Sequence, residues 1–127
     1  MSSIAFDLEL TDVEREIYQT IHRFAEEVMR PAGQELDKMP TPEATIAPGS
    51  VMWRVIDQYA ALGVAEFAAS ATELTPIQMA RTQAMINEEL GWGDAGLALV
   101  LGSYGGGMAN WLASTTGNPE LLERFGP

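Results

Sequence analysis

The sequence predicts an all-α protein, an antiparallel bundle of about five or six helices. Apolar residues recur at three- and four-residue steps along most of the chain, which is the period of a helix with one buried face. Capping signals divide this pattern into segments, and no segment combines strict alternation with the turn residues of a hairpin. The 127 residues are expected to form one domain with its own core.

Composition and charge exclude several classes of function. Seven basic against eighteen acidic residues give a net charge of −11, which repels nucleic acids and anionic lipids. The chain has no cysteine and therefore no disulfide, thiolate metal site or catalytic thiol. Residues 1–16 lack the basic and apolar regions of a secretory signal. We expect a cytoplasmic protein that does not bind nucleic acid.

The first helix is signalled by a capping box, in which the side chains of Thr11 and Glu14 each accept a hydrogen bond from the other's backbone N–H. An apolar stripe at helical spacing follows as far as Val28, and the charged residues between its members, Glu14 included, are expected to face water. Pro31 cannot continue the hydrogen-bond ladder undisturbed. It predicts a kink, followed by a short helical piece through about Asp37.

The middle of the chain begins with a proline-rich stretch. Three prolines between residues 38 and 49 predict a stiff connection. Ser50 is expected to cap a second helix that ends at Gly63. Residues 64–74 are mildly apolar and fit a strand or a coil equally well.

The sharpest local signal is Thr75-Pro76-Ile77-Gln78, a threonine cap with proline at the first helical position and glutamine at the third. It predicts a helix from Pro76 to Leu90 that stops at Gly91. Asp94 is expected to cap the following segment, and Asn118, followed by proline, is expected to cap a final helix.

Residues 97–114 contain no charged side chain and hold three adjacent glycines. A helix over 97–101 without a polar side is expected in the middle of a bundle. A further helix over 106–115 is bent or separated from it by the glycines at 105–107. Polar residues, glycines and the lack of flanking basic residues argue against a membrane span. The missing lysine and strand argue against a phosphate loop.

The residues alone predict no catalytic site and no metal site. His22 is the only histidine, and without an E-x-x-H pair it cannot form the di-iron centre of a ferritin-type bundle. Side chains adjacent on a helix point about 100° apart, so Glu26-Glu27 and Glu88-Glu89 are interpreted as solvated helix faces. No serine has a visible histidine and acid to activate it.

The order of these signals resembles the acyl-CoA dehydrogenases. "LTDVEREIYQTIHRFAEEVMRPAGQELDK" resembles the first helix of their N-terminal helical domain, and "MWRVIDQYAALGV" resembles the next. The end of the chain, with "EEL", an apolar helix, "TTGNPE" and "LLERFGP", is similar to the closing part of that domain. The resemblance extends over nearly the whole chain, and it rests on the order and spacing of the motifs more than on any single one.

The resemblance implies one domain of a three-part flavoenzyme, in which a β-domain holds much of the FAD. A glutamate of a C-terminal helical bundle removes the α-proton of an acyl-CoA thioester, while the β-hydride passes to flavin N5. Neither of those parts is present in the 127 residues. We therefore expect the N-terminal domain of a longer enzyme of fatty acid metabolism, inactive alone and binding FAD weakly or not at all.

The resemblance also implies partners and a binding surface. The partners are an acyl-CoA substrate, an electron-transfer flavoprotein and other copies of the same chain in a homo-oligomer. The central apolar helix is expected to supply one wall of the acyl pocket, from positions i, i+3, i+4 and i+7 of one face if the helix continues through the glycines. These positions are Leu101, Tyr104, Gly105 and Met108.

Three alternatives remain open from the sequence. The four positions of that wall equally fit simple packing between helices. The full-length protein could be a flavin oxidase or monooxygenase that shares the fold. The chain could also be an acidic helical interaction module without catalysis.

Overall fold

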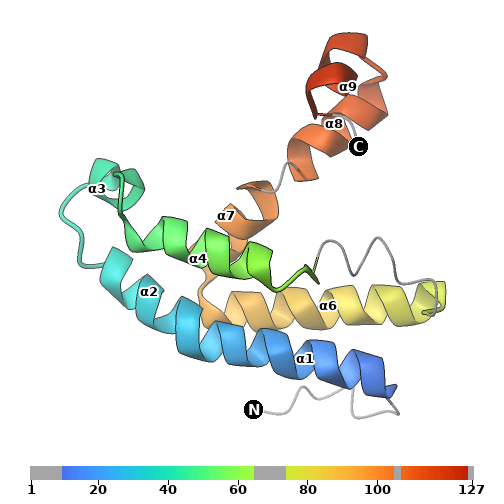
Figure 1. Ribbon diagram of the computed structural model, residues 1–127, viewed down its shortest axis with the longest axis horizontal. Coiled ribbons are helices and arrows are strands. Elements are labelled where there is room, and N and C mark those ends of the chain that lie inside the picture. Colours follow the sequence, from blue (N-terminus) through green and yellow to red (C-terminus); the bar gives the residue numbers. More distant parts are fainter. Residues whose placement is uncertain (1–9, 65–73, 105–106, 126–127) are drawn as a thin grey trace.

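The computed structural model describes residues 10–64, 74–104 and 107–125, and every element in these ranges is helical (Figure 1). The all-α fold predicted from the sequence is confirmed. The elements are α1 (Asp12–Phe24), the π-helical turn η1 (Ala25–Met29), α2 (Arg30–Leu36), α3 (Pro42–Ile46), α4 (Val51–Ala61), α6 (Pro76–Gly93), α7 (Ala95–Tyr104), α8 (Gly107–Thr116) and α9 (Pro119–Phe125).

α1, η1 and α2 follow one another as a single bent rod (Figure 1). The predicted kink is present, but it begins before Pro31, in the wider turn of η1, where the Arg30 N–H bonds to the Ala25 carbonyl five residues back. Pro31 is then the second residue of α2. A proline ring collides with the carbonyl four residues before it in an α-helix, and a π-turn at that place relaxes the ladder.

The predicted caps are present. In each of them a side-chain oxygen accepts a hydrogen bond from a backbone N–H of the first helical turn. The capping residues are Thr11 for α1, Ser50 for α4, Thr75 for α6, Asp94 for α7 and Asn118 for α9. Gly63 follows α4 with a φ of 67°, a left-handed conformation that suits glycine and ends the helix.

One predicted boundary is wrong, and the predicted connection contains an additional short helix. α6 does not stop at Gly91 but continues to Gly93, because Gly91 does not take the left-handed conformation of a helix end. The stretch from 38 to 49 contains a short helix, α3, which Thr41 caps. Residues 65–73, where the sequence fitted a strand or a coil, lie outside the described residues.

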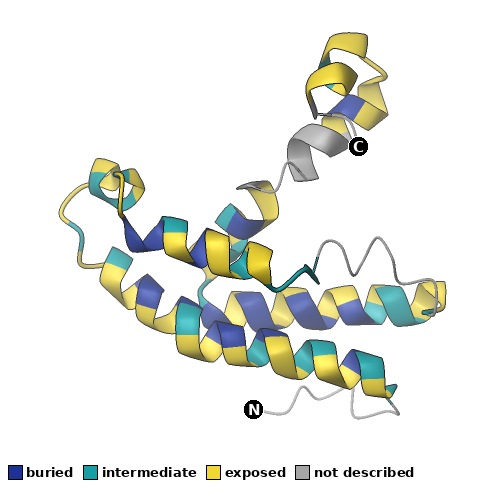
Figure 2. Ribbon diagram, in the orientation of Figure 1, coloured by how far each residue is buried: buried dark blue, intermediate teal, exposed yellow. Residues whose placement is uncertain are grey.

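α1 packs along α6, and α4 crosses above them in the opposite direction (Figure 1). α1 and α6 run in the same direction. α7 contacts both α6 and α4, whereas α8 and α9 pack on each other and extend away from the first helices. Figure 2 shows that the buried positions of α1, α4 and α6 face one another. Core side chains include Ile21, Phe24, Met29, Val55, Ile56, Leu90, Leu97 and Leu101.

In the part of the chain that the structure describes, no helix combines the length and the apolar content needed to cross a membrane.

Two glycines allow the bent rod to approach the end of α6. A Cβ atom on Gly93 would lie 2.9 Å from the Cβ and 3.1 Å from the Cα of Ala25. A Cβ atom on Gly33 would lie 2.9 Å from the Cγ of Asp94. A Cβ does not fit at such distances unless its neighbours move, so Gly93 lets the backbones approach closely and Gly33 leaves room for the Asp94 side chain.

Replacing Gly93 with alanine is therefore expected to destabilise the chain by about 2 kcal/mol, since the new methyl group meets the backbone of Ala25. Gly91 provides the matched control, because it is exposed in the same helix and a Cβ there meets nothing within 4 Å. Gly91→Ala should stabilise the helix by about 0.5–1 kcal/mol. Urea unfolding of both variants measures the difference, and equal effects would contradict the close crossing.

Candidate functional site: a groove between α6 and α7

Asp94 sets the direction in which α7 leaves α6. Its Oδ1 accepts a hydrogen bond of 2.8 Å from the Leu97 N–H, and its carboxyl group lies against Gly33 of α2. In the helix that begins there, the side chains of Leu97 and Leu101 pack in the core. The opposite side of the helix carries Leu99, which is 75% exposed.

The exposed side of α7 borders a groove of about 490 Å³, a volume within the range of small-molecule sites. α7 contributes positions i, i+3, i+4 and i+7 of one helical face. Small side chains predominate there, so the groove is open, and none of the lining residues that the structure describes is charged. The lining residues are Tyr59 from α4, Gln83, Asn87, Leu90 and Gly91 from α6, and Ala95, Ala98, Leu99 and Gly102 from α7.

The wall predicted from the sequence is not the face that lines this groove. Leu101 is 7% exposed and belongs to the core. α7 ends at Tyr104 and α8 begins at Gly107, while Gly105 and the side chains of Tyr104 and Met108 lie outside the described residues. The predicted wall thus stays a prediction, and only Leu101 has a described position.

Sequence reasoning missed Ala98, Leu99 and Gly102. It took α7 to be enclosed on all sides because every residue from 97 to 101 is apolar. The available signal was the spacing of small residues, since Ala95, Ala98 and Gly102 fall on one helical face. Among the described residues of α7, the structure buries Leu97 and Leu101 and leaves Leu99 exposed.

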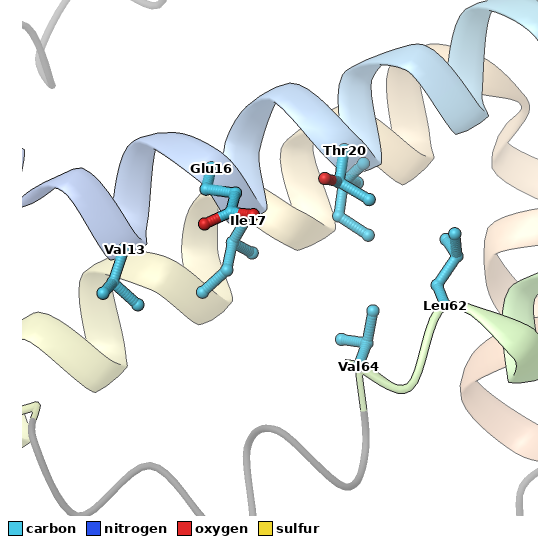
Figure 3. Close-up of a pocket in the computed structure, with 7 residues that line it drawn as sticks. Val13, Glu16, Ile17, Thr20, Leu62 and Val64 are labelled. Carbon is cyan, nitrogen blue, oxygen red and sulfur yellow. The ribbon is translucent and has the colours of Figure 1, made fainter.

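A smaller groove of about 230 Å³ lies between α1 and the segment after α4 (Figure 3). Val13, Ile17 and Thr20 form one wall, with Leu62 and Val64 across from them. Val64 is followed in the chain by residues 65–73, which the structure does not describe. Only the part of the groove lined by the residues named above is therefore described.

A family model described as "Acyl-CoA dehydrogenase, N-terminal domain" matches residues 11–127. The chain belongs to the acyl-CoA dehydrogenase family. A search of curated proteins and a search of solved structures each gave no match.

Full-length enzymes of the acyl-CoA dehydrogenase family carry FAD, and the capped helix ends among the described residues are poor sites for its phosphates. The phosphates of a dinucleotide bind at open helix N-termini or beside cations. Here the N-termini of α1, α4, α6, α7 and α9 are occupied by their own capping side chains, and the net charge is −11. Among the described residues, no group of three or more His, Asp or Glu could hold a metal ion.

Glu14 of this acyl-CoA dehydrogenase domain is buried, contrary to the prediction that it faces water. It is 0% exposed. Arg81 donates to both of its carboxylate oxygens, Nε to Oε1 at 2.9 Å and Nη2 to Oε2 at 2.7 Å. Burial raises the pKa of Glu14, but hydrogen bonds from Arg81 and Thr11, and the charge of Arg81, outweigh burial and hold this pKa below its ordinary value.

Glu89 is also buried, at 7% exposed, so the interpretation of Glu88-Glu89 as a solvated face is wrong at this residue. The Nδ1 of the half-buried His22 lies 2.6 Å from Glu89 Oε2. Burial raises the pKa of Tyr18, and the charge of Glu89 and a hydrogen bond with it raise this pKa further. The carboxylate therefore joins two side chains of α1 to α6.

The ring of His22 continues into a stack across the two helices. Its centroid lies 5.1 Å from that of Trp92 and 6.0 Å from that of Tyr18, with nearly parallel planes. The guanidinium carbon of Arg30 lies 4.7 Å from the Trp92 centroid, within cation–π range. The stack and the bond to Glu89 together account for the position of His22 without a catalytic role.

Because the folded-state pKa of Glu14 is lowered, its contribution to stability is complete above the unfolded pKa of about 4.5 and is lost as the pH falls through the folded pKa. Arg81→Met leaves a buried carboxylate without its cation and should cost about 3 kcal/mol at neutral pH. The cost should shrink below pH 4.5, where Glu14 can take up a proton.

Arg15→Met provides the control, because Arg15 is exposed on α1, next to Glu14, and donates to the Leu10 carbonyl. Urea unfolding at neutral and acidic pH should show a small, pH-independent effect for this variant. An Arg81→Met effect as small as that of the control would contradict the importance of the buried pair.

Proposed function

We propose that the chain is the N-terminal domain of an FAD-dependent acyl-CoA dehydrogenase and that the α6–α7 groove forms part of its acyl pocket. The observation that supports this assignment is the groove itself, together with membership of the family. An uncharged groove lined by Ala98, Leu99 and Gly102 suits an alkyl chain, whose burial contributes about 0.8 kcal/mol per methylene group.

Exposed apolar side chains fit a domain that normally meets other parts of a larger protein. Besides Leu99, large apolar residues are exposed on α6, α8 and α9. These are Ile77, Trp92, Leu112 and Leu122. The sequence of α7 predicts a helix enclosed on all sides. In the full-length enzyme that we propose, the substrate and the other domains would cover the side that is exposed here.

The chemistry then belongs to parts of the protein beyond this chain. Dehydrogenation removes one hydrogen from the α-carbon and one from the β-carbon of the acyl chain, and the flavin accepts the electrons. We assign FAD, the catalytic base and the contact with an electron-transfer flavoprotein to the remaining domains. The chain alone is then inactive, and the full-length enzyme is a cytoplasmic homo-oligomer of fatty acid metabolism.

The proposed function is tested with the full-length protein, purified under anaerobic conditions and mixed with acyl-CoA. We expect a yellow protein whose flavin absorbance bleaches on mixing, while the 127-residue chain shows no turnover. A full-length product without flavin would contradict the proposal and favour an interaction module. Oxygen consumption during turnover would indicate an oxidase or monooxygenase instead.

The groove is tested by Gly102→Phe in the full-length protein. Gly102 is exposed, lines the groove, and has nothing within 4 Å of an added Cβ, so a larger side chain there is expected to narrow the groove without a clash at its Cβ. We expect the preferred acyl chain to become shorter, with kcat/KM for longer chains falling by about tenfold or more. Ser103→Phe is the control, because Ser103 is exposed on α7 outside the groove.

An unchanged chain-length preference in Gly102→Phe would show that the acyl chain does not lie against this face of α7. The same substitution at Gly105 tests the wall predicted from the sequence. A shift at Gly105 without one at Gly102 would favour that wall over the groove.

A further inference from the structure

The α6–α7 groove has an apolar part and a polar part. α7 contributes only Ala95, Ala98, Leu99 and Gly102. Gln83 and Asn87, one helical turn apart on α6, and Tyr59 of α4 line the rest of it together with Leu90 and Gly91. An alkyl chain has no use for the three polar groups, so they need a separate explanation.

The amide groups of Gln83 and Asn87 retain hydrogen-bonding capacity. Gln83 Nε2 donates to Asn87 Oδ1 at 3.1 Å, which uses one donor and one acceptor of the pair. The Gln83 carbonyl and the Asn87 amide N–H groups remain, and turning both amides over would leave the same capacity. The pair therefore keeps both donors and acceptors for a ligand in the groove.

Tyr59 is a further neutral residue of the lining. Its hydroxyl carries a proton at neutral pH, as phenols do, and burial raises the pKa further, so it can donate to a ligand that reaches it. With three neutral groups and no charged lining residue, the groove matches an uncharged oxygen better than a carboxylate, which would be desolvated without a cation beside it.

We propose that the preferred acyl chain carries a neutral oxygen function, a hydroxyl or keto group, which hydrogen bonds with Gln83, Asn87 and Tyr59. This inference rests on the proposed function of the groove. A plain alkyl chain that covers these groups removes their water and returns no hydrogen bond, and such unpaired groups are costly. A site with hydrogen-bonding groups thereby selects against the analogue that lacks the oxygen.

The test uses the full-length protein and acyl-CoAs of one chain length, either unsubstituted or with a hydroxyl group on each successive carbon beyond the β-carbon. We expect kcat/KM to be about tenfold higher for one hydroxyl position, or two adjacent ones, than for the unsubstituted chain. Asn87→Leu and Gln83→Met, which keep similar shapes on an exposed helix surface, should remove this preference. Ser103→Leu, outside the groove, should retain it.

The outcomes separate the two proposals. Equal kcat/KM across the series in the wild-type protein, with the flavin reduced normally, would overturn the oxygen function and leave the proposed function in place. A preference that persists in both the Asn87 and the Gln83 variants would also overturn it, because these groups would then not be its source. No flavin reduction by any acyl-CoA would overturn both proposals.

Discussion

The close crossing of the bent rod and the end of α6 is the constraint on which the rest of the structure depends. Gly93 lets α6 approach Ala25, and Gly33 makes room for the carboxyl group of Asp94. Asp94 is also the cap of α7, so the place where α7 begins follows from the same crossing. The groove lies between α6 and α7, and its position is therefore set by two glycines that do not line it.

The other end of the α1–α6 contact is fixed by charge instead of by small residues. Glu14 and Arg81 form a two-point bond beside the capping box of α1. Glu89 joins α6 to His22 further along the same contact. Buried carboxylates are costly unless they are paired, so a shift of α1 along α6 by one turn would leave both unpaired. The pairs thus specify the register, whereas the apolar stripe alone permits several.

Local and long-range features differed in how well the sequence predicted them. The caps at Thr11, Thr75 and Asp94 were predicted because each depends on residues three positions away or fewer. The burial of Glu14 and Glu89 was missed because their partners are 67 residues away in the chain. The end of α6 was misplaced because a glycine such as Gly91 ends a helix only where it adopts a positive φ, and the sequence does not show which φ it takes.

The sequence does not show which residues far apart in the chain come into contact, and for this reason the candidate site was only partly predicted. The resemblance to the family implied that α7 would border a substrate, whereas its apolar sequence alone predicted a helix in the middle of a bundle. A helix without a polar side does not reveal which face meets the core, and the face chosen included Leu101, which packs in the core. Contacts with α4 and α6 determine which face of α7 is buried: Leu97 and Leu101 are in the core, and Leu99 stays at the surface. The exposed apolar face of α7 is the one that borders the groove, and it supports the proposed acyl pocket because an alkyl chain laid on it would be removed from water.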